Sequence, residues 1–275
     1  MSHFSWGAFV DGLAVTAVAV LLLMLVTWLI GQAIGRFNVV DVAWGLGFVV
    51  VAWVAYGASA GEGNDTRRLL VAVLVSIWGL RLAGYIAIRS RGKGEDPRYA
   101  DMLERAKGDP GVYALRSIYL TQAIALWFIS LPVQVSMFER SEPGVLLWVG
   151  TAVWAVGLFF EAVGDAQLNR FRADPASKGR VMDRGLWRYT RHPNYFGDAT
   201  VWWGLWLIAA QQWAGVLTIL SPVLMTWTLT RKTGKPLLEQ GMADRRPGYT
   251  DYVARTSGFF PLPPKHTVGP SDAPG

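Results

Sequence analysis

The chain has 275 residues, of which 52% are hydrophobic and 17% are charged, and its formal net charge at pH 7 is +6. It contains no cysteine, which excludes disulfides, thiolate metal sites and a cysteine nucleophile. The hydrophobic residues come in long runs, which excludes an ordinary water-soluble globule and indicates a multi-pass membrane protein.

The first apolar run extends from Leu13 to Ala33 and contains no charged residue. It is about 20 residues long, which is the length that a helix needs to cross the hydrocarbon core. The stretch MSHFSWGAFVDG before it has no Lys or Arg, so we expect a retained membrane helix and not a cleavable signal peptide. Further runs predict spans, the last but one of them short, at Val39–Tyr56, Leu69–Ile88, Ile118–Phe138, Val145–Val163, Ala199–Gln211 and Val216–Leu229.

Lys and Arg are distributed unevenly among the segments between these seven spans. If the N-terminus lies outside, the inside segments hold 22 of the 26 cations and the outside segments hold three, with Arg81 left inside a span. Positively charged loops stay in the cytoplasm. The sequence therefore predicts an all-α fold with seven transmembrane helices, an outer N-terminus and a cytoplasmic C-terminus, with the active site facing the cytoplasm.

Topology and contact with anionic lipid headgroups account for the net positive charge, so no nucleic-acid partner is expected. We expect a single transmembrane domain over residues 1–262. The end of the chain, residues 263–275, is rich in Pro and Gly, and this composition predicts a disordered tail. No metal site is expected, and the oligomeric state is not indicated by any feature of the sequence.

Two clusters of polar residues lie in or beside the second and third spans, where ionisable side chains are costly. Asn38 and Asp41 share a helix face at the start of the second span. Either of them could be a helix-capping residue, but Asp41 is followed by apolar sequence, and we favour a functional role for it. Arg81, Tyr85 and Arg89 recur every four residues on the third span. Arg89 can reach the headgroups, and Tyr85 is either functional or an interfacial aromatic residue.

A third cluster closes the fifth span in the stretch FFEAVGDAQLNRFRADP. Glu161, Asp165 and Arg172 fall on one helix face, and Glu161 is embedded in apolar sequence. In the predicted topology all three clusters come to the cytoplasmic side, which predicts a polar pocket that opens to the cytoplasm.

The loop after the fifth span contains cations and aromatic residues in the stretch GLWRYTRHPNYFGD, Gly185 to Asp198. Arg guanidinium groups match phosphate oxygens well, so the loop predicts a site for an anionic, phosphorylated ligand. Positive-inside topology is the alternative explanation for any single cation. Asn194 and Asp198 are four residues apart behind Pro193, a typical first-turn residue, and an amide with a carboxylate could bind a carboxamide or ribose hydroxyls.

With GDAQLNRFRADPASKGRVMDR before it and GYTDYVARTSGFFP far behind it, this loop resembles the C-terminal domain of the steroid 5-alpha-reductase superfamily, in its bacterial DUF1295 branch. The resemblance covers roughly residues 37–261 and is strongest in the last hundred residues. It implies seven transmembrane helices, NADPH as the cofactor in a cytosol-facing cavity, and reduction of a carbon–carbon double bond conjugated to a carbonyl. The lipophilic substrate, a steroid, polyprenoid or enoyl lipid, would enter from the bilayer.

The resemblance also implies roles for individual residues. Tyr85 matches the catalytic Tyr of the family, and Asp41 matches its catalytic Glu. We therefore expect Tyr85 to donate a proton to the substrate carbonyl and Asp41 to share or relay it. A cofactor-binding part is expected at about residues 161–262, with these contributing side chains: Glu161, Asp165, Arg172, Arg180, Tyr189, Arg191, His192, Asn194, Tyr195, Asp198, Tyr249 and Tyr252.

Three features depart from the steroid enzymes. Those enzymes have Asn in place of Glu161, Glu in place of Asp198, and a His near the last helix where this chain shows Lys235. Membrane methyltransferases of the isoprenylcysteine carboxyl methyltransferase type share an RHPNY-like element and an acid that Glu239 resembles. A methyltransferase that uses S-adenosylmethionine is therefore an alternative, and a non-enzymatic sterol- or lipid-binding membrane protein is another. The five cations of the loop suit a sulfonium cofactor less well than a phosphorylated one: Lys178, Arg180, Arg184, Arg188 and Arg191.

Overall fold

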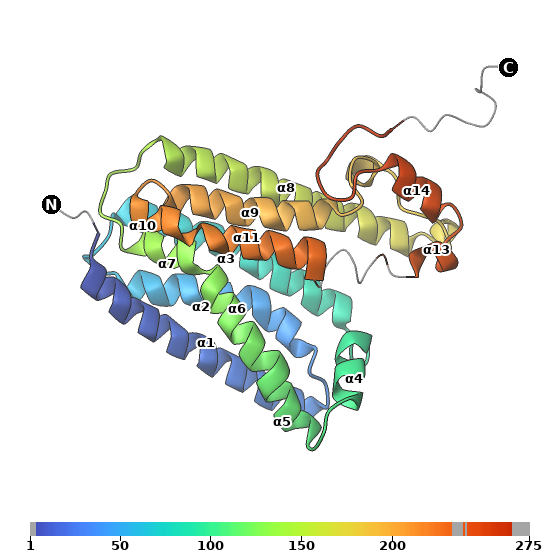
Figure 1. The fold of residues 1–275 in the computed structure, drawn as a ribbon, viewed down its shortest axis with the longest axis horizontal. Helices are drawn as coiled ribbons and strands as arrows, with labels where there is room; N and C mark the ends of the chain where they lie inside the picture. Colours follow the sequence, from blue (N-terminus) through green and yellow to red (C-terminus); the bar gives the residue numbers. More distant parts are fainter. Residues whose placement is uncertain (1–3, 233–238, 240, 266–275) are drawn as a thin grey trace. The chain divides into compact units, whose positions relative to one another are not determined.

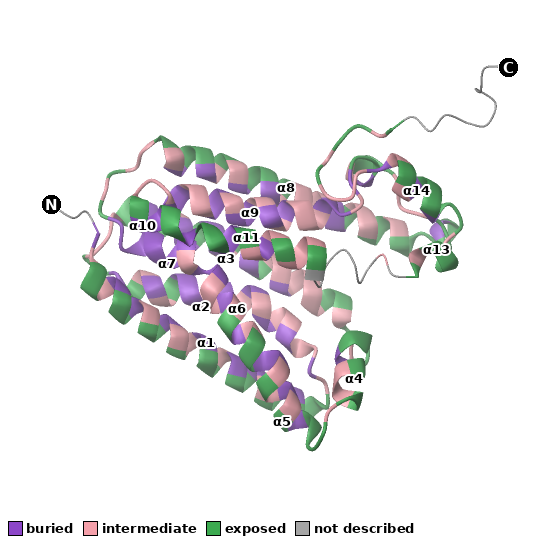
Figure 2. Cartoon of the chain, in the orientation of Figure 1, coloured by how far each residue is buried: buried purple, intermediate pink, exposed green. Residues whose placement is uncertain are grey.

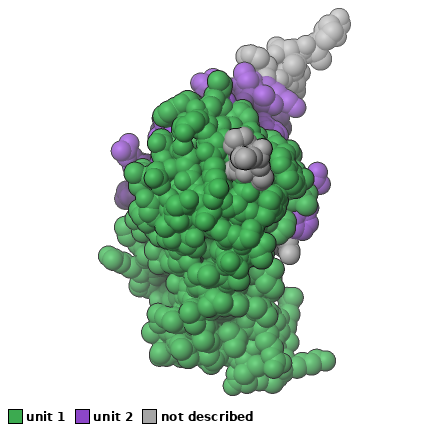
Figure 3. Space-filling view, turned by 90° about the vertical axis from the view of Figure 1, so that its left-hand side faces the viewer, with its two compact units in different colours: residues 1–148, 206–221 green, residues 149–205, 222–275 purple. Residues whose placement is uncertain are grey.

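The computed structural model describes residues 4–232, 239 and 241–265, and all regular elements in this part of the chain are helices. The chain divides into two compact units (Figure 3). The first contains residues 1–148 and 206–221, and the second contains residues 149–205 and 222–275. Lys235 lies outside the described residues, as does most of the predicted tail at 263–275.

The first unit is a bundle of long helices with short ones between them (Figure 1). Helices α1, α2 and α3 follow one another as a hairpin series, and α6 packs against α1 and α2. The bounds are α1 Trp6–Ile34, α2 Val39–Ala58, α3 Asp65–Ser90, α4 Pro97–Glu104, α5 Pro110–Ala114, η1 Leu115–Tyr119, α6 Leu120–Ile129, α7 Leu131–Met137, α10 Trp213–Val216 and η4 Leu217–Ile219.

The second unit is built on three further helices and a C-terminal segment (Figure 1). The ends of the three long helices extend by a few residues beyond the bounds of the unit. The bounds are α8 Val145–Ala173, η2 Pro175–Ser177, η3 Gly185–Arg188, α9 Pro193–Ala209, α11 Leu220–Trp227, η5 Thr228–Lys232, α13 Met242–Arg245 and α14 Tyr249–Arg255.

Six helical stretches of the described chain are long and apolar enough to cross a membrane, namely Trp6–Ile34, Val39–Ala58, Asp65–Ser90, Pro110–Ile129, Val145–Ala173 and Trp213–Arg231. Each overlaps a predicted span. The remaining predicted span, Ala199–Gln211, coincides with α9, which has 17 residues and is shorter than these six. The described part of the chain is thus all-helical with six candidate membrane spans, while seven spans and the orientation of the termini stay predictions.

The apolar surface of α1 supports a membrane location. Five consecutive or near-consecutive large apolar side chains on its second half are between 42% and 56% exposed, and Figure 2 shows exposed positions along the helix: Leu21, Leu22, Leu25, Val26 and Leu29. In water so large an apolar patch would be unfavourable, whereas lipid tails are suitable neighbours for it.

One predicted span begins and ends elsewhere in the structure. The sequence analysis placed it at Ile118–Phe138, but the helical stretch runs over Pro110–Ile129. It starts early because the Asp109 carboxylate accepts a hydrogen bond from the Val112 amide at 2.8 Å and Pro110 occupies the first turn. It stops early because Pro132 lies in the first turn of α7, and a proline cannot continue a preceding helix.

Glycines allow the α2 and α3 backbones to approach closely. A β-carbon on Gly45 would lie 2.5 Å from the Gly79 carbonyl oxygen, and one on Gly79 would lie 2.6 Å from that of Gly45. Small residues at such crossings permit dense packing in membrane helices. The contact fixes how α2 and α3 are aligned along their axes, one turn away from Asp41.

We predict that Gly45→Val lowers the stability of the protein by about 1–3 kcal/mol, because the new side chain must displace the backbone of α3. Gly57→Val, in the same helix but with nothing within 4 Å of an added β-carbon, is the matched control. The measurement is the melting temperature of both purified variants in detergent. Equal losses in the two variants would show that helix propensity, and not the close crossing, governs the result.

Candidate functional site

The first polar cluster is centred on Asp41, in the first turn of α2. One carboxylate oxygen accepts a hydrogen bond from the Tyr99 hydroxyl at 2.5 Å, and the other accepts one from the Arg98 guanidinium at 3.0 Å. Both donors belong to α4, which begins at Pro97 with Asp96 as its cap. The Asp96 carboxylate accepts from the Arg98 amide at 2.9 Å. A short capped helix therefore delivers a phenol and a cation to the carboxylate.

Tyr99 is buried, with 7% of its surface exposed, and its hydroxyl oxygen also accepts a hydrogen bond at 3.2 Å from the side-chain amide of Gln122 on α6. Burial raises the pKa of Tyr99 well above its usual value, and the nearby charge of Asp41 raises it further. The phenol therefore stays protonated and serves as a donor. Sequence reasoning missed Tyr99 and Gln122; the only local signal was an Asp-Pro helix start two residues before the Tyr.

The loop before α4 is attached to the start of α2. The Glu95 carboxylate accepts hydrogen bonds from the backbone amides of Phe37 at 2.5 Å and of Asn38 at 2.9 Å. Asn38 makes no side-chain capping bond and instead donates to the Gly94 carbonyl at 3.1 Å. Glu95 thus binds the two backbone amides just before α2, and Asn38, considered above as a capping residue, makes no side-chain capping bond.

Tyr85 lies between two guanidinium groups in the last turns of α3. The carbon at the centre of the Arg81 guanidinium is 5.6 Å from the centre of the Tyr85 ring, and that of Arg89 is 5.7 Å from it. Such contacts stabilise cations in a region of low dielectric constant. Because α2 and α3 form a hairpin, Tyr85 and Asp41 lie toward the same end of the pair (Figure 1). Their joint catalytic role stays a prediction, and the bonded partners of Asp41 are Tyr99 and Arg98.

The second polar cluster lies between α8 and α9. Gly197 faces Glu161 so closely that an added β-carbon would lie 2.8 Å from the Glu161 β-carbon. The Asn194 side-chain amide donates to the Asp165 carboxylate at 3.1 Å, and only 3% of Glu161 and 4% of Asp165 is exposed. The structure therefore brings together these predicted residues. Asp198, one turn after Asn194, is half-buried on the same helix.

The basic loop after α8 contains two kinds of cation. Most of its cations are exposed, and within the described residues their side chains form no hydrogen bond or ion pair: Lys178, Arg180, Arg184 and Arg188. These groups are available to an anion. Arg172, at the end of α8, is exposed as well.

Arg191 differs from the other loop cations, because 10% of its side chain is exposed and its guanidinium is used within the protein. Nε donates to Glu239 Oε1 at 2.9 Å, while one Nη donates to the carbonyls of Val253 at 3.1 Å and Thr256 at 3.0 Å. Most of its donors are thus occupied within the protein, where Arg191 anchors the C-terminal segment, and its contact with a cofactor phosphate stays a prediction.

His192 shares the same carboxylate. Its Nε2 lies 2.8 Å from Glu239 Oε1, and its ring stacks on that of Tyr195 at 9° with centroids 5.6 Å apart. Burial alone would raise the pKa of Glu239, but the hydrogen bonds with His192 and Arg191 outweigh burial and lower it to about 2. Glu239 therefore remains ionised and ties the RHP stretch to the segment before α13.

The C-terminal segment covers the loop through backbone contacts and one buried phenol. The Tyr252 hydroxyl donates to the Trp187 carbonyl at 2.6 Å, and the Leu262 amide donates to the Tyr189 carbonyl at 3.0 Å. Tyr249 and Tyr252 are 8% and 3% exposed. Both tyrosines are therefore packed within the protein, and their expected contact with the cofactor stays a prediction, whereas Tyr189, at 42% exposed, is accessible.

Among the described residues no group of three or more His, Asp or Glu side chains is arranged to hold a metal ion. The second cluster and the basic loop together suit a ligand that combines phosphates with hydroxyl or amide groups. The loop cations provide donors for phosphate oxygens, and the Asp165–Asn194 pair offers both acceptors and a donor.

Comparisons with known proteins show the family and two curated relatives. The sequence pattern of the family described as "Protein of unknown function (DUF1295)" matches residues 27–256. An uncharacterised protein of Schizosaccharomyces pombe is 24% identical over 233 residues, which cover 73% of this chain and 65% of that protein. A steroid 5-alpha-reductase of Arabidopsis thaliana is 32% identical over 80 residues, covering 27% of this chain and 30% of the relative. The chain thus spans less than two thirds of either curated relative, and no solved structure matches it.

We predict that Glu239→Gln destabilises the protein at neutral pH by on the order of 2 kcal/mol, because Arg191 and His192 lose the charge that they share. Since the folded-state pKa of about 2 lies below the ordinary 4.5, the carboxylate stabilises the fold fully above pH 4.5 and loses this effect as the pH falls toward 2. The difference in melting temperature between the wild type and the variant should therefore shrink across that window.

Glu104→Gln is the matched control, because Glu104 is exposed at the end of α4 and forms no ion pair within the described residues. It should leave the melting temperature and its pH dependence unchanged. A constant gap between wild type and Glu239→Gln from neutral pH to pH 2 would contradict the assigned ionised state.

Proposed function

The chain belongs to the DUF1295 family, and from this premise we propose that it is an NADPH-dependent membrane reductase. Its substrate would be a lipophilic molecule with a carbon–carbon double bond conjugated to a carbonyl. The observation that carries the proposal is that one unit holds both four loop cations without a side-chain partner among the described residues and the Asp165–Asn194 pair of the second cluster. The similarity to a plant protein named as a steroid 5-alpha-reductase supports the same reaction class.

The residues of the second unit fit the parts of NADPH. Arg172 and Arg180, both exposed, would bind its phosphates. Asn194 and the carboxylates of Asp165 and Asp198 would bind ribose hydroxyls or the nicotinamide carboxamide, with Glu161 beside them. The chain has no Gly-x-Gly-x-x-Gly stretch after a strand, so this loop would take the place of a Rossmann domain.

Tyr85 and Asp41 would supply the proton. NADPH, when bound, provides a hydride for the β-carbon of the enone, and negative charge then develops on the carbonyl oxygen. We assign Tyr85 as the donor to that oxygen and Asp41 as the group that shares or relays the proton. The resulting enol becomes the saturated carbonyl compound when the proton on oxygen is exchanged for one on the α-carbon. Tyr99 and Arg98 would hold the Asp41 carboxylate in one orientation through their two hydrogen bonds.

We further propose that α9 is a membrane span, which gives seven spans with the N-terminus outside and the active site facing the cytoplasm. Its 17 residues extend about 25 Å at 1.5 Å per residue, somewhat less than the hydrocarbon core. A small tilt or local thinning of the bilayer would absorb the difference. The strong excess of Lys and Arg on one side supports this count.

A methyltransferase that uses S-adenosylmethionine is the second candidate. The observation in its favour is that the Arg and His of the RHP stretch meet on Glu239 in one buried cluster. The same cluster also has a sufficient structural explanation, because it anchors the C-terminal segment. A sterol- or lipid-binding protein without catalysis would not need Asp41, Tyr99 and Gln122 in one hydrogen-bonded network.

We predict that NADPH and NADP⁺ raise the melting temperature of the protein in detergent, because a ligand that binds the folded state stabilises it by mass action. Arg180→Ala should raise the apparent Kd for NADPH about tenfold by removing one charge-assisted contact. Arg105→Ala, an exposed cation at the end of α4, is the control and should bind normally. Stabilisation by S-adenosylmethionine alone would overturn the reductase proposal and favour the methyltransferase.

We also predict that Tyr85→Phe lowers kcat for enone reduction by about 100-fold or more, while NADPH binding is unchanged, because one donor to the developing oxyanion is lost. Tyr99→Phe should cause a smaller loss, about tenfold, since its hydroxyl acts through Asp41. The measurement is single-turnover oxidation of NADPH with each purified variant. If Tyr85→Phe keeps full kcat and Tyr99→Phe does not, the donor would be Tyr99 and the assignment of Tyr85 would be wrong.

A further inference from the structure

Arg116 lies inside the candidate span Pro110–Ile129, yet its guanidinium forms no hydrogen bond or ion pair within the part of the chain that the structure describes. An unpaired cation in a membrane helix is unfavourable unless it reaches water or an anion. It belongs to the π-helical turn η1, and such turns occur often at functional sites.

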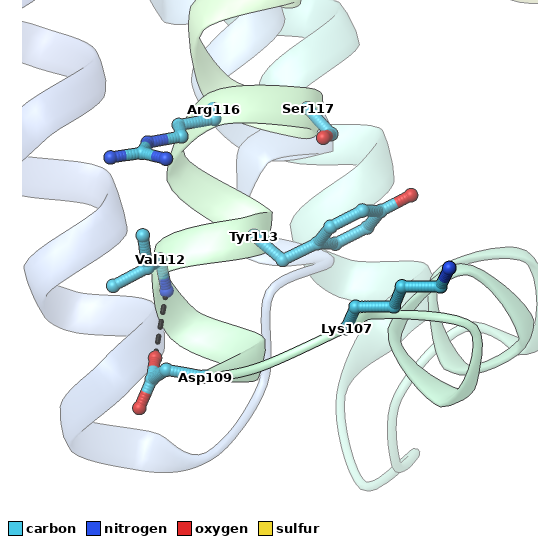
Figure 4. A pocket seen from close by; sticks show the side chains of 6 residues that line it. All are labelled: Lys107, Asp109, Val112, Tyr113, Arg116 and Ser117. Carbon is cyan, nitrogen blue, oxygen red and sulfur yellow. Dashed lines mark hydrogen bonds between the residues drawn. The ribbon is translucent and has the colours of Figure 1, made fainter.

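A polar hollow of about 220 Å³ lies on one side of this helix end (Figure 4). It is lined by Lys107, Asp109, Val112, Tyr113, Arg116 and Ser117. The Asp109 carboxylate also lines the hollow, where it accepts from the Val112 amide and caps α5, and its charge offsets part of the positive charge there. Lys107 has no bonded partner among the described residues. The hollow thus holds two cations and one carboxylate together with a phenol and a hydroxyl.

Arg116 also lines a second, apolar groove of about 300 Å³ between α1 and the η1–α6 stretch. The walls of this groove are formed chiefly by Leu21, Met24 and Leu25 of α1 and by Leu115, Leu120 and Ala123. From Leu115 to Ala123 the helix rises about 12 Å, close to the thickness of one leaflet's hydrocarbon. Figure 4 shows the Arg116 side chain directed away from Tyr113 and Lys107, toward the neighbouring long helix.

We propose that these two hollows form one binding site for an anionic phospholipid. Arg116 binds the phosphate, and one acyl chain lies in the groove along α1. The occupant is a lipid because the site joins a cationic end to an almost wholly apolar channel on a membrane helix. The inference depends on membrane residence alone and stands whether or not the chain is a reductase.

The test is native mass spectrometry of the protein released from detergent micelles that contain phosphatidylglycerol or phosphatidylcholine with the same acyl chains. The wild type should retain one phosphatidylglycerol. Arg116→Gln should weaken its retention about fivefold, the equivalent of one interfacial cation. Arg91→Gln is the control, because Arg91 is an exposed cation in the loop after α3, outside both hollows. It should retain the lipid fully.

A second variant, Leu120→Gln, keeps the charge and alters only the groove, at a position that is 44% exposed and outside the buried core. It should also reduce retention of phosphatidylglycerol. An equal loss in Arg91→Gln and Arg116→Gln would overturn the proposal in favour of general surface charge. Equal retention of phosphatidylcholine would also overturn it, because that result would not require an anionic lipid. A rise in melting temperature with inorganic phosphate as large as that with the lipid would do the same, because it would not require the groove.

Discussion

A charge that leaves water must find a partner within the protein, and this constraint determines how the membrane-facing parts of the chain are arranged. Asp41 begins an apolar helix and is accommodated because α4 brings Tyr99 and Arg98 to it. Arg191 is equally dependent on Glu239 and on two carbonyls of the C-terminal segment. In each case a charge on one element requires a second element, distant in the sequence, to be in place. The polar network thereby specifies the packing as well as the candidate chemistry.

Close helix crossings bring the residues of these networks near one another. Where Gly45 meets Gly79, the backbones of α2 and α3 approach so closely that nothing larger than hydrogen fits. The α8–α9 pair repeats this arrangement at Gly157, Gly197 and Gly204, each of which faces the partner backbone. Side chains one turn away from such crossings are held at short range, as the Asn194–Asp165 hydrogen bond shows. Apolar helices without these glycines would stand further apart, and their carboxylates would lack neighbours.

Most of the helical architecture could be read from the sequence, since apolar runs of about 20 residues have few alternatives to a membrane helix. The error at Ile118–Phe138 arose because hydrophobicity continues through Pro132 while the backbone cannot. The Glu161–Asp165 face and its α9 partners followed from helical spacing. Tyr99 could not be found in this way, because α4 is short and its partner Asp41 lies 58 residues earlier. Pairings at that separation depend on tertiary structure, which periodicity does not report.

The same limit explains why the cations of the basic loop could not be told apart in advance. In the sequence Arg180 and Arg191 look equivalent, and a positive-inside count treats them alike. In the structure Arg191 is buried against Glu239, 48 residues away, whereas Arg180 has no side-chain partner among the described residues. A guanidinium engaged in this way stabilises the fold and has few donors left for a ligand. An exposed guanidinium without a partner among the described residues can bind an external anion, which we propose to be a cofactor phosphate at the loop and a lipid at Arg116. Whether a cation is already paired within the protein, more than the number of cations, therefore indicates which of them can bind a ligand.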